Sequence, residues 1–373
     1  MGPFQLDWGS LQGRLSRFPF SMLLAFLSFL YGLGIKARAK AYSLGVLGQR
    51  SLRGFVLSVG NLTAGGTGKT PAVIMLAQWA QGQGYNVCVL TRGYGGAYGD
   101  EVLEVTDGAE VKVGWRECGD EAYLVARRLE GVPVIVARKR YLGGQYAAEK
   151  FGSNFFILDD GFQHLRLKRD FDLVLVDSLD PFGNGHLLPR GILREPVHEI
   201  KRCQAIVLTR WEQGAECKRS EFQMKKMFPQ IPLFVAQHVV DKVVIPARDL
   251  VHEASYLSGK RVIGFAGIGK PEAFRHTLLS LGAEVIYFRK FKDHHRFQKE
   301  EIESLREKAI TLKADLLITT EKDWVRLKDF GPDFLQAGYV SIRFSLGAQG
   351  PQLFSLINKR AIQVIEDLGE HEE

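Results

Sequence analysis

Short apolar runs alternate along this chain with longer, helix-like stretches. The first run, residues 55–59, leads into a glycine-rich segment, and residues 71–83 then follow a helical pattern. This alternation continues almost to the carboxyl terminus, which favours an α/β fold with a largely parallel sheet. The expected strands of the first part of the chain are residues 55–59, 86–91, 132–136, 155–158, 173–176 and 205–208.

A second unit with the same alternation begins near residue 259. Its expected elements are strand 261–266, helix 270–281, strand 284–288, helix 299–313 and strand 316–319, then strand 339–344 and a final helix. The 373 residues are enough for two domains with separate cores. Residues 231–244 look extended and are predicted to connect the units. Residues 213–226 are predicted to be a polar surface segment, and residues 319–323 a loop.

The amino-terminal segment departs from this pattern. Residues 18–35 contain no charged side chain and are rich in Phe, Leu and Met, and basic residues flank them on both sides. Four alternatives stay open: a cleaved signal peptide, a spanning helix, a buried core helix, and a helix at a membrane surface. In the last, a face of small residues packs on the protein and a bulky face meets lipid. The small residues are Ser21, Ala25, Ser28 and Gly32.

Charge and cysteine usage narrow the classes of partner. The formal net charge is +7, which suits an anionic partner such as a phosphorylated substrate or acidic lipid. No basic stripe is interleaved with aromatic residues, so no nucleic-acid partner is expected. The four cysteines are scattered and form no Cys-x-x-Cys pair. We therefore expect a reducing compartment, with neither a disulfide framework nor a zinc site.

A phosphate-binding loop is predicted between the first strand and its helix. Glycines let main-chain N–H groups turn toward phosphate oxygens, and the amino terminus of the helix adds partial positive charge. Lys69 can reach the β- and γ-phosphates, and the Thr70 hydroxyl can ligate Mg²⁺. The residues expected to bind ATP are Thr63, Ala64, Gly65, Gly66, Thr67, Gly68, Lys69 and Thr70, with Thr63 in place of the usual first glycine.

Acidic residues end two of the predicted strands. Asp159 and Asp160 follow strand 155–158, and Asp177 follows strand 173–176. Mg²⁺ prefers hard oxygen ligands, and a phosphate loop needs an acidic residue on a neighbouring strand. We predict that Asp159 and Asp160 bind the metal together with Thr70, with Asp177 as the second choice. The alternative is a solvated turn.

Two other polar groups are ambiguous on spacing alone. Asp120 and Glu121 precede the helical stretch 122–129, where an ordinary helix cap is the simpler interpretation. Asp293, His294 and His295 belong to the loop 291–297. They could bind a metal, act as a base, orient one, or form a hydrated loop.

Taken together, these motifs resemble one family, the tetraacyldisaccharide 4'-kinases, which are the lipid A 4'-kinases of Gram-negative bacteria. The motifs appear in the order of the family and span most of the chain. A first residue other than glycine in the phosphate loop is common in that family. The matching segments are 58–71, Thr-Arg-Gly-Tyr at 91–94, Gly-Asp-Glu at 119–121, Asp-Asp-Gly-Phe-Gln-His at 159–164, Asp-His-His at 293–295 and Thr-Glu-Lys-Asp at 320–323.

The resemblance implies an ATP- and Mg²⁺-dependent kinase acting on the 4'-hydroxyl of a tetraacyl glucosamine disaccharide 1-phosphate. It also implies a P-loop NTPase-like domain with a parallel sheet, and a second, smaller α/β/α domain joined to it by a two-stranded linker. At the matching positions Asp120 becomes the base, assisted by His294, and Lys69 meets the γ-phosphate. The residues expected to contact the substrate are Asn61, Arg92, Tyr94, Gln163 and His164.

On this interpretation the chain divides into five segments and works at a membrane. They are a membrane-associating helix (1–40), a P-loop kinase domain (41–230), the linker (231–256), the smaller domain (257–331), and a return strand with the last helix (332–373). The expected partners are the glycolipid and the membrane surface, with no obligate protein partner, at the cytoplasmic face of the inner membrane of a Gram-negative bacterium. The alternatives are a P-loop NTPase of the metal-insertion or partitioning type and a membrane-bound nucleotide switch.

Overall fold

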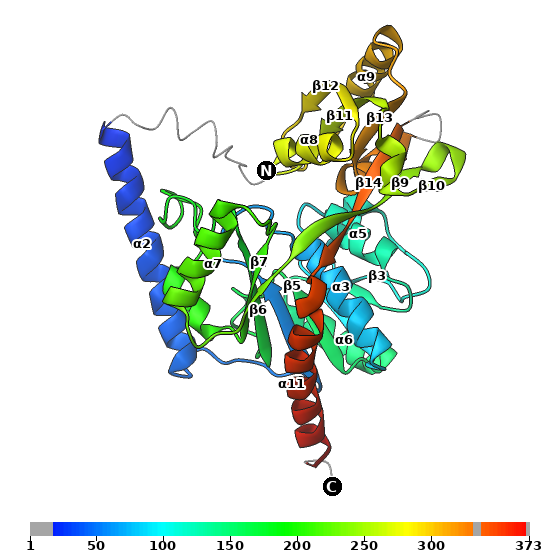
Figure 1. Ribbon diagram of the computed structural model, residues 1–373. Coiled ribbons are helices and arrows are strands. Elements are labelled where there is room, and N and C mark those ends of the chain that lie inside the picture. Colours follow the sequence, from blue (N-terminus) through cyan, green and yellow to red (C-terminus); the bar gives the residue numbers. More distant parts are fainter. Residues whose placement is uncertain (1–17, 331–336, 371–373) are drawn as a thin grey trace.

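The computed structural model describes residues 18–330 and 337–370 of the chain. Two β-sheets, one of eight strands and one of six, form the centres of two layered units. Figure 1 shows the smaller unit, coloured yellow to orange, standing over one end of the larger unit. A long amino-terminal helix lies along the side of the larger unit. The α/β fold predicted from the sequence is confirmed.

The larger sheet has the strand order β3-β4-β2-β5-β1-β6-β7-β8. Neighbouring strands are parallel except at the β3–β4 edge. The central strands are buried on both faces, which explains their continuous apolar runs in the sequence. The strands are β1 (Phe55–Gly60), β2 (Val87–Thr91), β3 (Val102–Thr106), β4 (Val134–Ala137), β5 (Phe155–Asp159), β6 (Phe171–Asp177), β7 (Ala205–Thr209) and β8 (Leu233–Val235).

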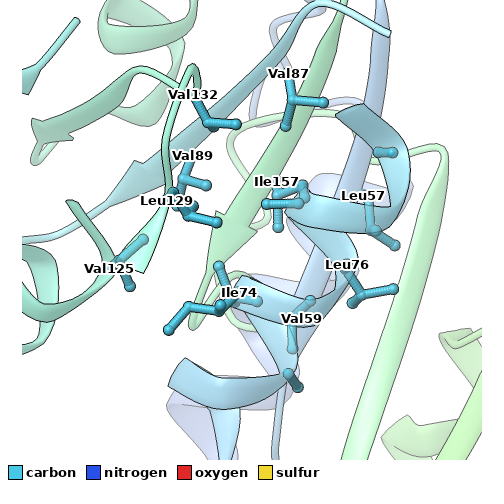
Figure 2. Packing of buried hydrophobic residues seen from close by; sticks show 14 of the residues in the cluster. Leu57, Val59, Ile74, Leu76, Val87, Val89, Val125, Leu129, Val132 and Ile157 are labelled. Atoms are coloured by element: carbon cyan, nitrogen blue, oxygen red, sulfur yellow. The ribbon is translucent and has the colours of Figure 1, made fainter. Parts of the chain in front are cut away.

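Helices cover both faces of the larger sheet. One face packs against α3 (Lys69–Gly82), α5 (Asp120–Arg128) and α11 (Gly350–Glu370). Figure 2 shows part of this core, in which Leu57 and Val59 of β1 lie close to Leu76 of α3. The other face packs against α6 (Arg140–Phe151) and α7 (Ala215–Met227).

The smaller sheet has the strand order β10-β9-β14-β13-β11-β12. Helix α8 (Pro271–Ser280) packs on one face and α9 (Lys299–Thr311) on the other. The short helix α10 (Glu321–Leu327) follows β13 directly. The strands are β9 (Gln237–Ile245), β10 (Leu250–His252), β11 (Arg261–Ala266), β12 (Glu284–Lys290), β13 (Leu316–Thr320) and β14 (Ala337–Ser345).

Strands β9 and β14 form an antiparallel pair that joins the two units. The first residues of β14 pair with β13 in the smaller sheet, while its last residues pair with the start of β9. Helix α11 then returns to the larger unit, where Leu353, Ile357 and Ala361 enter the main core. The two-stranded linker implied by the family resemblance is therefore present.

Helix α2 (Phe18–Ser43) lies apart from both cores. The stretch Ser21–Ser43 is long and apolar enough to cross a membrane, and only 11% of its apolar window is buried, so it is not a core helix. The face of small residues packs on the protein: Ser28 Oγ donates to the Leu187 carbonyl at 2.9 Å. A Cβ atom at Gly32 would lie 2.9 Å from a Leu187 methyl group. The exposed side chains of the opposite face are Met22, Leu23, Phe26, Leu27, Phe29, Leu30 and Leu33.

Several predicted elements differ from those observed. Residues 213–226 lie at the surface as predicted, but they are largely helical, in α7, which buries only Cys217, Ser220 and Met224. Residues 319–323, predicted to be a loop, contain the start of α10, where the Thr320 side chain accepts a hydrogen bond from the Asp323 N–H. The edge strand β3 and helix α6 were not predicted, because β3 is only half-buried and α6 carries two glycines. The predicted segments 1–17, 331–336 and 371–373 lie outside the described residues.

Candidate active site

The carboxyl ends of the parallel strands of both sheets meet across the junction of the two units. Ligands of open α/β sheets bind at this edge of the sheet. Lys270, which follows β11, makes an ion pair of 2.7 Å with Asp177 at the end of β6. His294, which follows β12, contacts Asp120 at the start of α5 at 2.9 Å. The predicted motifs of the two units thus come together in one polar region.

The predicted phosphate loop connects β1 to α3. Gly65 and Gly68 have φ values of 120° and 84°, which side chains with a Cβ rarely adopt. Gly68 lies directly before the first residue of α3, so the helix begins at Lys69, two residues earlier than predicted. The exposed residues of the loop, Gly65 and Gly66, leave its outer surface open. This is the geometry of an anion site at the amino terminus of a helix.

Asn61 supports this loop from beneath. Its side chain is fully buried, donates to the Thr63 carbonyl at 2.9 Å and accepts from Lys69 Nζ at 3.1 Å. The guanidinium of Arg194 also donates to its side-chain oxygen. Asn61 was predicted to contact the substrate; in this structure its side chain has no exposed surface and contacts Lys69.

Asp159 and Asp160 lie at the end of β5 in different environments. Asp159 is buried, and burial together with the charges of Glu121 and Asp160 raises its pKa to about 7. Burial would also raise the pKa of Asp160, but the charges of Lys69 and Arg194 outweigh it and lower that pKa. Two Arg194 nitrogens donate to the Asp160 carboxylate at 2.8 Å each.

Asp177, the second choice for the metal, already has two cationic partners. It is buried and accepts from Lys270 Nζ at 2.7 Å and from the guanidinium of Arg210. The same guanidinium donates to the carbonyl of Gly66 in the phosphate loop at 3.0 Å. Asp177 therefore links the smaller unit to the phosphate loop.

Asp120 and His294 form a polar contact between the units. His294 Nδ1 lies 2.9 Å and 3.2 Å from the two carboxylate oxygens of Asp120. Asp120 is only 4% exposed, so burial would raise its pKa. The hydrogen bond from His294 and the positive charges of nearby side chains, that of Lys322 first, outweigh burial and lower the pKa of Asp120 to about 2. Asp120 is therefore ionised at neutral pH, and is more than a helix cap.

Of the remaining predicted substrate residues, Tyr94 lies against His294. Tyr94 is 49% exposed, and its ring centroid lies 5.5 Å from that of His294. Arg92 is exposed beside it. Gln163 Nε2 donates to the Asn61 carbonyl at 3.0 Å. Burial and nearby arginine charges lower the pKa of His164 to about 4, so this imidazole is neutral at physiological pH.

Comparison with known proteins identifies the family. The model of the tetraacyldisaccharide-1-P 4'-kinase family matches residues 20–361. This chain belongs to that family. The tetraacyldisaccharide 4'-kinase of Syntrophus aciditrophicus is 39% identical over 350 residues, which are 92% of this chain and 94% of that protein. The kinase of the same name from Geobacter metallireducens is 40% identical over 318 residues, 85% of this chain and 91% of that one.

A solved structure supports the fold of this family member. The crystal structure of LpxK from Aquifex aeolicus in complex with ATP superposes with a TM-score of 0.72 and 32% sequence identity. The alignment covers 91% of this chain and 99% of the Aquifex chain. The P-loop NTPase-like fold predicted from the sequence is thus confirmed.

Four cationic residues of this kinase-family site were not predicted from the sequence. Arg194 and Arg210 contact the phosphate-loop side, and Lys322 and Arg326 contact the Asp120 side. Lys322 belongs to the family motif at 320–323, but its position after a strand indicates no role by itself. Charges of this kind are common on protein surfaces, so only their burial and partners distinguish them.

Proposed function

We propose that this chain is an ATP-dependent kinase that phosphorylates the 4'-hydroxyl of a tetraacyldisaccharide 1-phosphate, giving the lipid IV-A stage of lipid A biosynthesis. The observation that carries the proposal is the pairing of Asp120 and His294 across the junction of the two units, at the edge that also holds the phosphate loop. Family membership and the names of the relatives supply the substrate class.

We assign ATP binding to residues 63–70. The ATP complex of the Aquifex relative supports ATP as the nucleotide. The open glycine-rich loop at the start of α3 supports these residues as its binding site. Lys69 would meet the charge of the transferred group, since its ammonium is held within 3.5 Å of Asp160 and 3.1 Å of Asn61. The positive charge of Lys69 also interacts electrostatically with Glu121, which lies beside Asp120 at the start of α5.

The residues at the end of β5 fit a magnesium ion. The raised pKa of Asp159 indicates that too little positive charge surrounds this buried carboxyl group. A divalent cation would supply that positive charge. Mg²⁺ is commonly held by one or two carboxylates together with substrate phosphates. Among the described residues no group of three or more acidic, His or Cys side chains could hold a metal alone. Thr70, Asp159 and Asp160 would therefore hold Mg²⁺, which neutralises charge on the phosphates.

Asp120 would act as the base. A sugar hydroxyl is a weak nucleophile, and a placed base contributes about 10²–10⁴ in rate. In the proposed step the hydroxyl proton passes to Asp120 while the hydroxyl oxygen bonds to the γ-phosphorus. The bond from that phosphorus to the bridging oxygen breaks, and ADP leaves. Because Asp120 is only 4% exposed, the segments covering it must move apart before the hydroxyl can reach it.

We assign the acceptor sugar to the surface beside His294. Tyr94 is exposed there, and Arg92, two residues earlier, is exposed as well; an aromatic ring and a guanidinium suit a phosphorylated sugar. Gln163 and His164 lie on the segment that follows Asp160, and we keep them as candidates for polar contacts to the disaccharide.

We propose that helix α2 holds the enzyme at the membrane that contains its lipid substrate. The exposed apolar face and the basic residues Lys36, Arg38 and Lys40 suit an anionic lipid surface. ATP is a cytosolic donor, so we place the chain on the cytoplasmic face of the inner membrane of a Gram-negative bacterium.

One experiment tests the activity directly. The full chain is incubated in detergent with γ-labelled ATP, Mg²⁺ and the disaccharide 1-phosphate lipid, and we expect label in the lipid. Label released only as inorganic phosphate would instead support a hydrolytic NTPase, and tight ATP binding without turnover would support a nucleotide switch. The Asp120→Ala variant should lose turnover while its affinity for ATP changes little.

A further inference from the structure

The first turn of α10 places a lysine against the outer edge of His294. Lys322 Nζ lies 3.2 Å from His294 Nε2 and 2.9 Å from the Glu121 carboxylate. Asp293 lies at the edge of contact, with an oxygen 4.0 Å away. The lysine side chain is 22% exposed, so these groups are its main surroundings. His294 is thus held between a carboxylate at Nδ1 and an ammonium at Nε2.

The two neighbours together select one form of the imidazole. A lysine ammonium has three donors and no acceptor, so a contact with His294 Nε2 requires a lone pair on that nitrogen. The remaining proton then sits on Nδ1, where it donates to the Asp120 carboxylate. Burial would lower the pKa of Lys322, but the charges of Glu121 and Asp120 outweigh it and raise that pKa, so the ammonium stays protonated.

The lysine contact at Nε2 disfavours the other two forms of the imidazole. A proton on Nε2 alone would face the ammonium and leave the Nδ1 lone pair 2.9 Å from a carboxylate oxygen. An imidazolium carries a proton on Nε2 as well, so it would have no lone pair there to accept a hydrogen bond from the lysine ammonium 3.2 Å away.

We propose that Lys322 is a positioning residue that holds His294 as the neutral Nδ1–H tautomer and through it orients the Asp120 carboxylate. Its link to activity rests on the function proposed above, while the tautomer itself does not. Orienting partners of this kind are a recurrent feature of histidine in functional sites.

The surrounding backbone supports this role. The Thr320 hydroxyl caps α10 and so fixes the turn that carries Lys322. The His294 main chain has a φ of 55°, and its N–H donates to the Gly267 carbonyl at 3.1 Å. Arg326 of the same helix donates to that carbonyl at 3.0 Å. The lysine and the imidazole are therefore held to one rigid point of the smaller unit.

The test uses the full chain labelled with ¹⁵N-histidine. The chain has nine histidines, and the signals of His294 are those lost in the His294→Gln variant. In the ATP-free protein at neutral pH we expect the neutral tautomer with the proton on Nδ1. Lys322→Met should convert His294 to a mixture of tautomers or to the Nε2–H form, whereas Lys322→Arg should keep Nδ1–H.

Lys328→Met is the matched control, because Lys328 also crosses between the units and contacts the Tyr123 hydroxyl at 2.7 Å. It should leave the His294 signals unchanged. In the labelled-ATP assay, Lys322→Met should lower kcat by about 10–100-fold with the KM for ATP within about twofold, and Lys322→Arg should restore much of the loss.

Two results would overturn the proposal. An Nε2–H tautomer in the wild-type chain contradicts it without any variant, so a failure of Lys322→Met to fold cannot obscure the answer. A tautomer that is unchanged in folded Lys322→Met also contradicts it. If the wild-type chain transfers no label to lipid, the proposed kinase function fails, and the tautomer measurement still decides the role of Lys322.

Discussion

At the residue scale, the site depends on charges whose partners are distant in the chain. Lys69 is held by Asn61 and lies near Asp160, and Asp120 is held by His294. A buried charge is tolerated only where such partners meet it. Single substitutions therefore separate the role of each charge.

Replacing the loop lysine should abolish most activity without unfolding the protein. Lys69→Ala removes a positive charge aimed at the transferred group, so we expect turnover to fall by about 10²–10³-fold. The measurement is label transfer from γ-labelled ATP to lipid, with thermal unfolding as the check on folding. Lys139→Ala, at an exposed lysine paired with Glu101, serves as control. Near-normal turnover of Lys69→Ala would refute the proposed role of the loop.

The low pKa of Asp120 makes a prediction about stability and pH. The folded pKa of about 2 lies below the ordinary value of about 3.9, so the stabilisation is complete above pH ~4 and is lost as the pH falls toward 2. The stability advantage of the wild type over Asp120→Asn should shrink by roughly 2 kcal/mol between about pH 5 and pH 2. Urea unfolding at a series of pH values measures this difference.

The exposed Asp100→Asn variant reports the effect of removing a carboxylate that lies away from the site. An advantage of the wild type over Asp120→Asn that does not depend on pH would contradict the ionised, hydrogen-bonded Asp120.

At the element scale, helix α2 has two faces with different tasks. Its small residues allow close approach to the segment around Leu187, where Tyr31 also donates to the Arg194 carbonyl at 2.9 Å. Its bulky residues have no protein partner that would bury them. Helix α10 differs from α2 in that it buries charged side chains, Asp323 and Arg326, at the junction of the units.

Replacing large apolar side chains on the exposed face of α2 should weaken membrane binding while the fold stays intact. Phe26 and Leu30 are 58% and 46% exposed and lie one helical turn apart. Each is worth about 1.5–3 kcal/mol when buried in lipid, so Phe26→Ser with Leu30→Ser should lower partitioning into anionic vesicles by about 100-fold or more. Flotation with vesicles measures the bound fraction.

The matched control is Ile310→Ser, which removes a side chain that is 78% exposed on α9 of the smaller unit. It should leave vesicle binding unchanged. Retention of the doubly substituted chain on vesicles would mean that another surface attaches the protein.

At the scale of the whole molecule, charged residues cross the junction of the two units at several places. Lys270 reaches Asp177, Lys322 reaches Glu121, and Arg128 reaches Glu321. The strand pair β9–β14 is the connection through which the chain passes between the two units. Ion pairs at such a junction favour the closed arrangement and are screened by salt.

Reversing one of these charges should favour separation of the units. Lys270→Glu places a carboxylate against buried Asp177, so we expect a larger radius of gyration by small-angle X-ray scattering and a KM for ATP raised about tenfold, or ~1.4 kcal/mol. Lys290→Glu is the control, since Lys290 pairs with Glu272 inside the smaller unit. An unchanged radius and an unchanged KM would show that this ion pair does not hold the units together.

The sequence by itself determined the features that lie within one continuous segment. The phosphate loop, the acidic ends of β5 and β6, and the amphiphilic amino-terminal helix depend on local spacing, because neighbouring residues of a strand or helix keep fixed relations in space. The α/β fold followed from the alternation of apolar runs and helical stretches. Family motifs then suggested the pairing of Asp120 with His294, which spacing alone interpreted as a helix cap and a loop.

Only the tertiary structure decided which distant residues meet. Asp120 and His294 are 174 residues apart, and their contact exists because two sheets present their carboxyl ends to each other. The same packing buried Asn61, paired Asp177 with Lys270, and brought Lys322 to the imidazole. Such contacts depend on strand order and on the junction of the units. No local pattern of residues specifies either, because burial and partners arise only when the whole chain has folded.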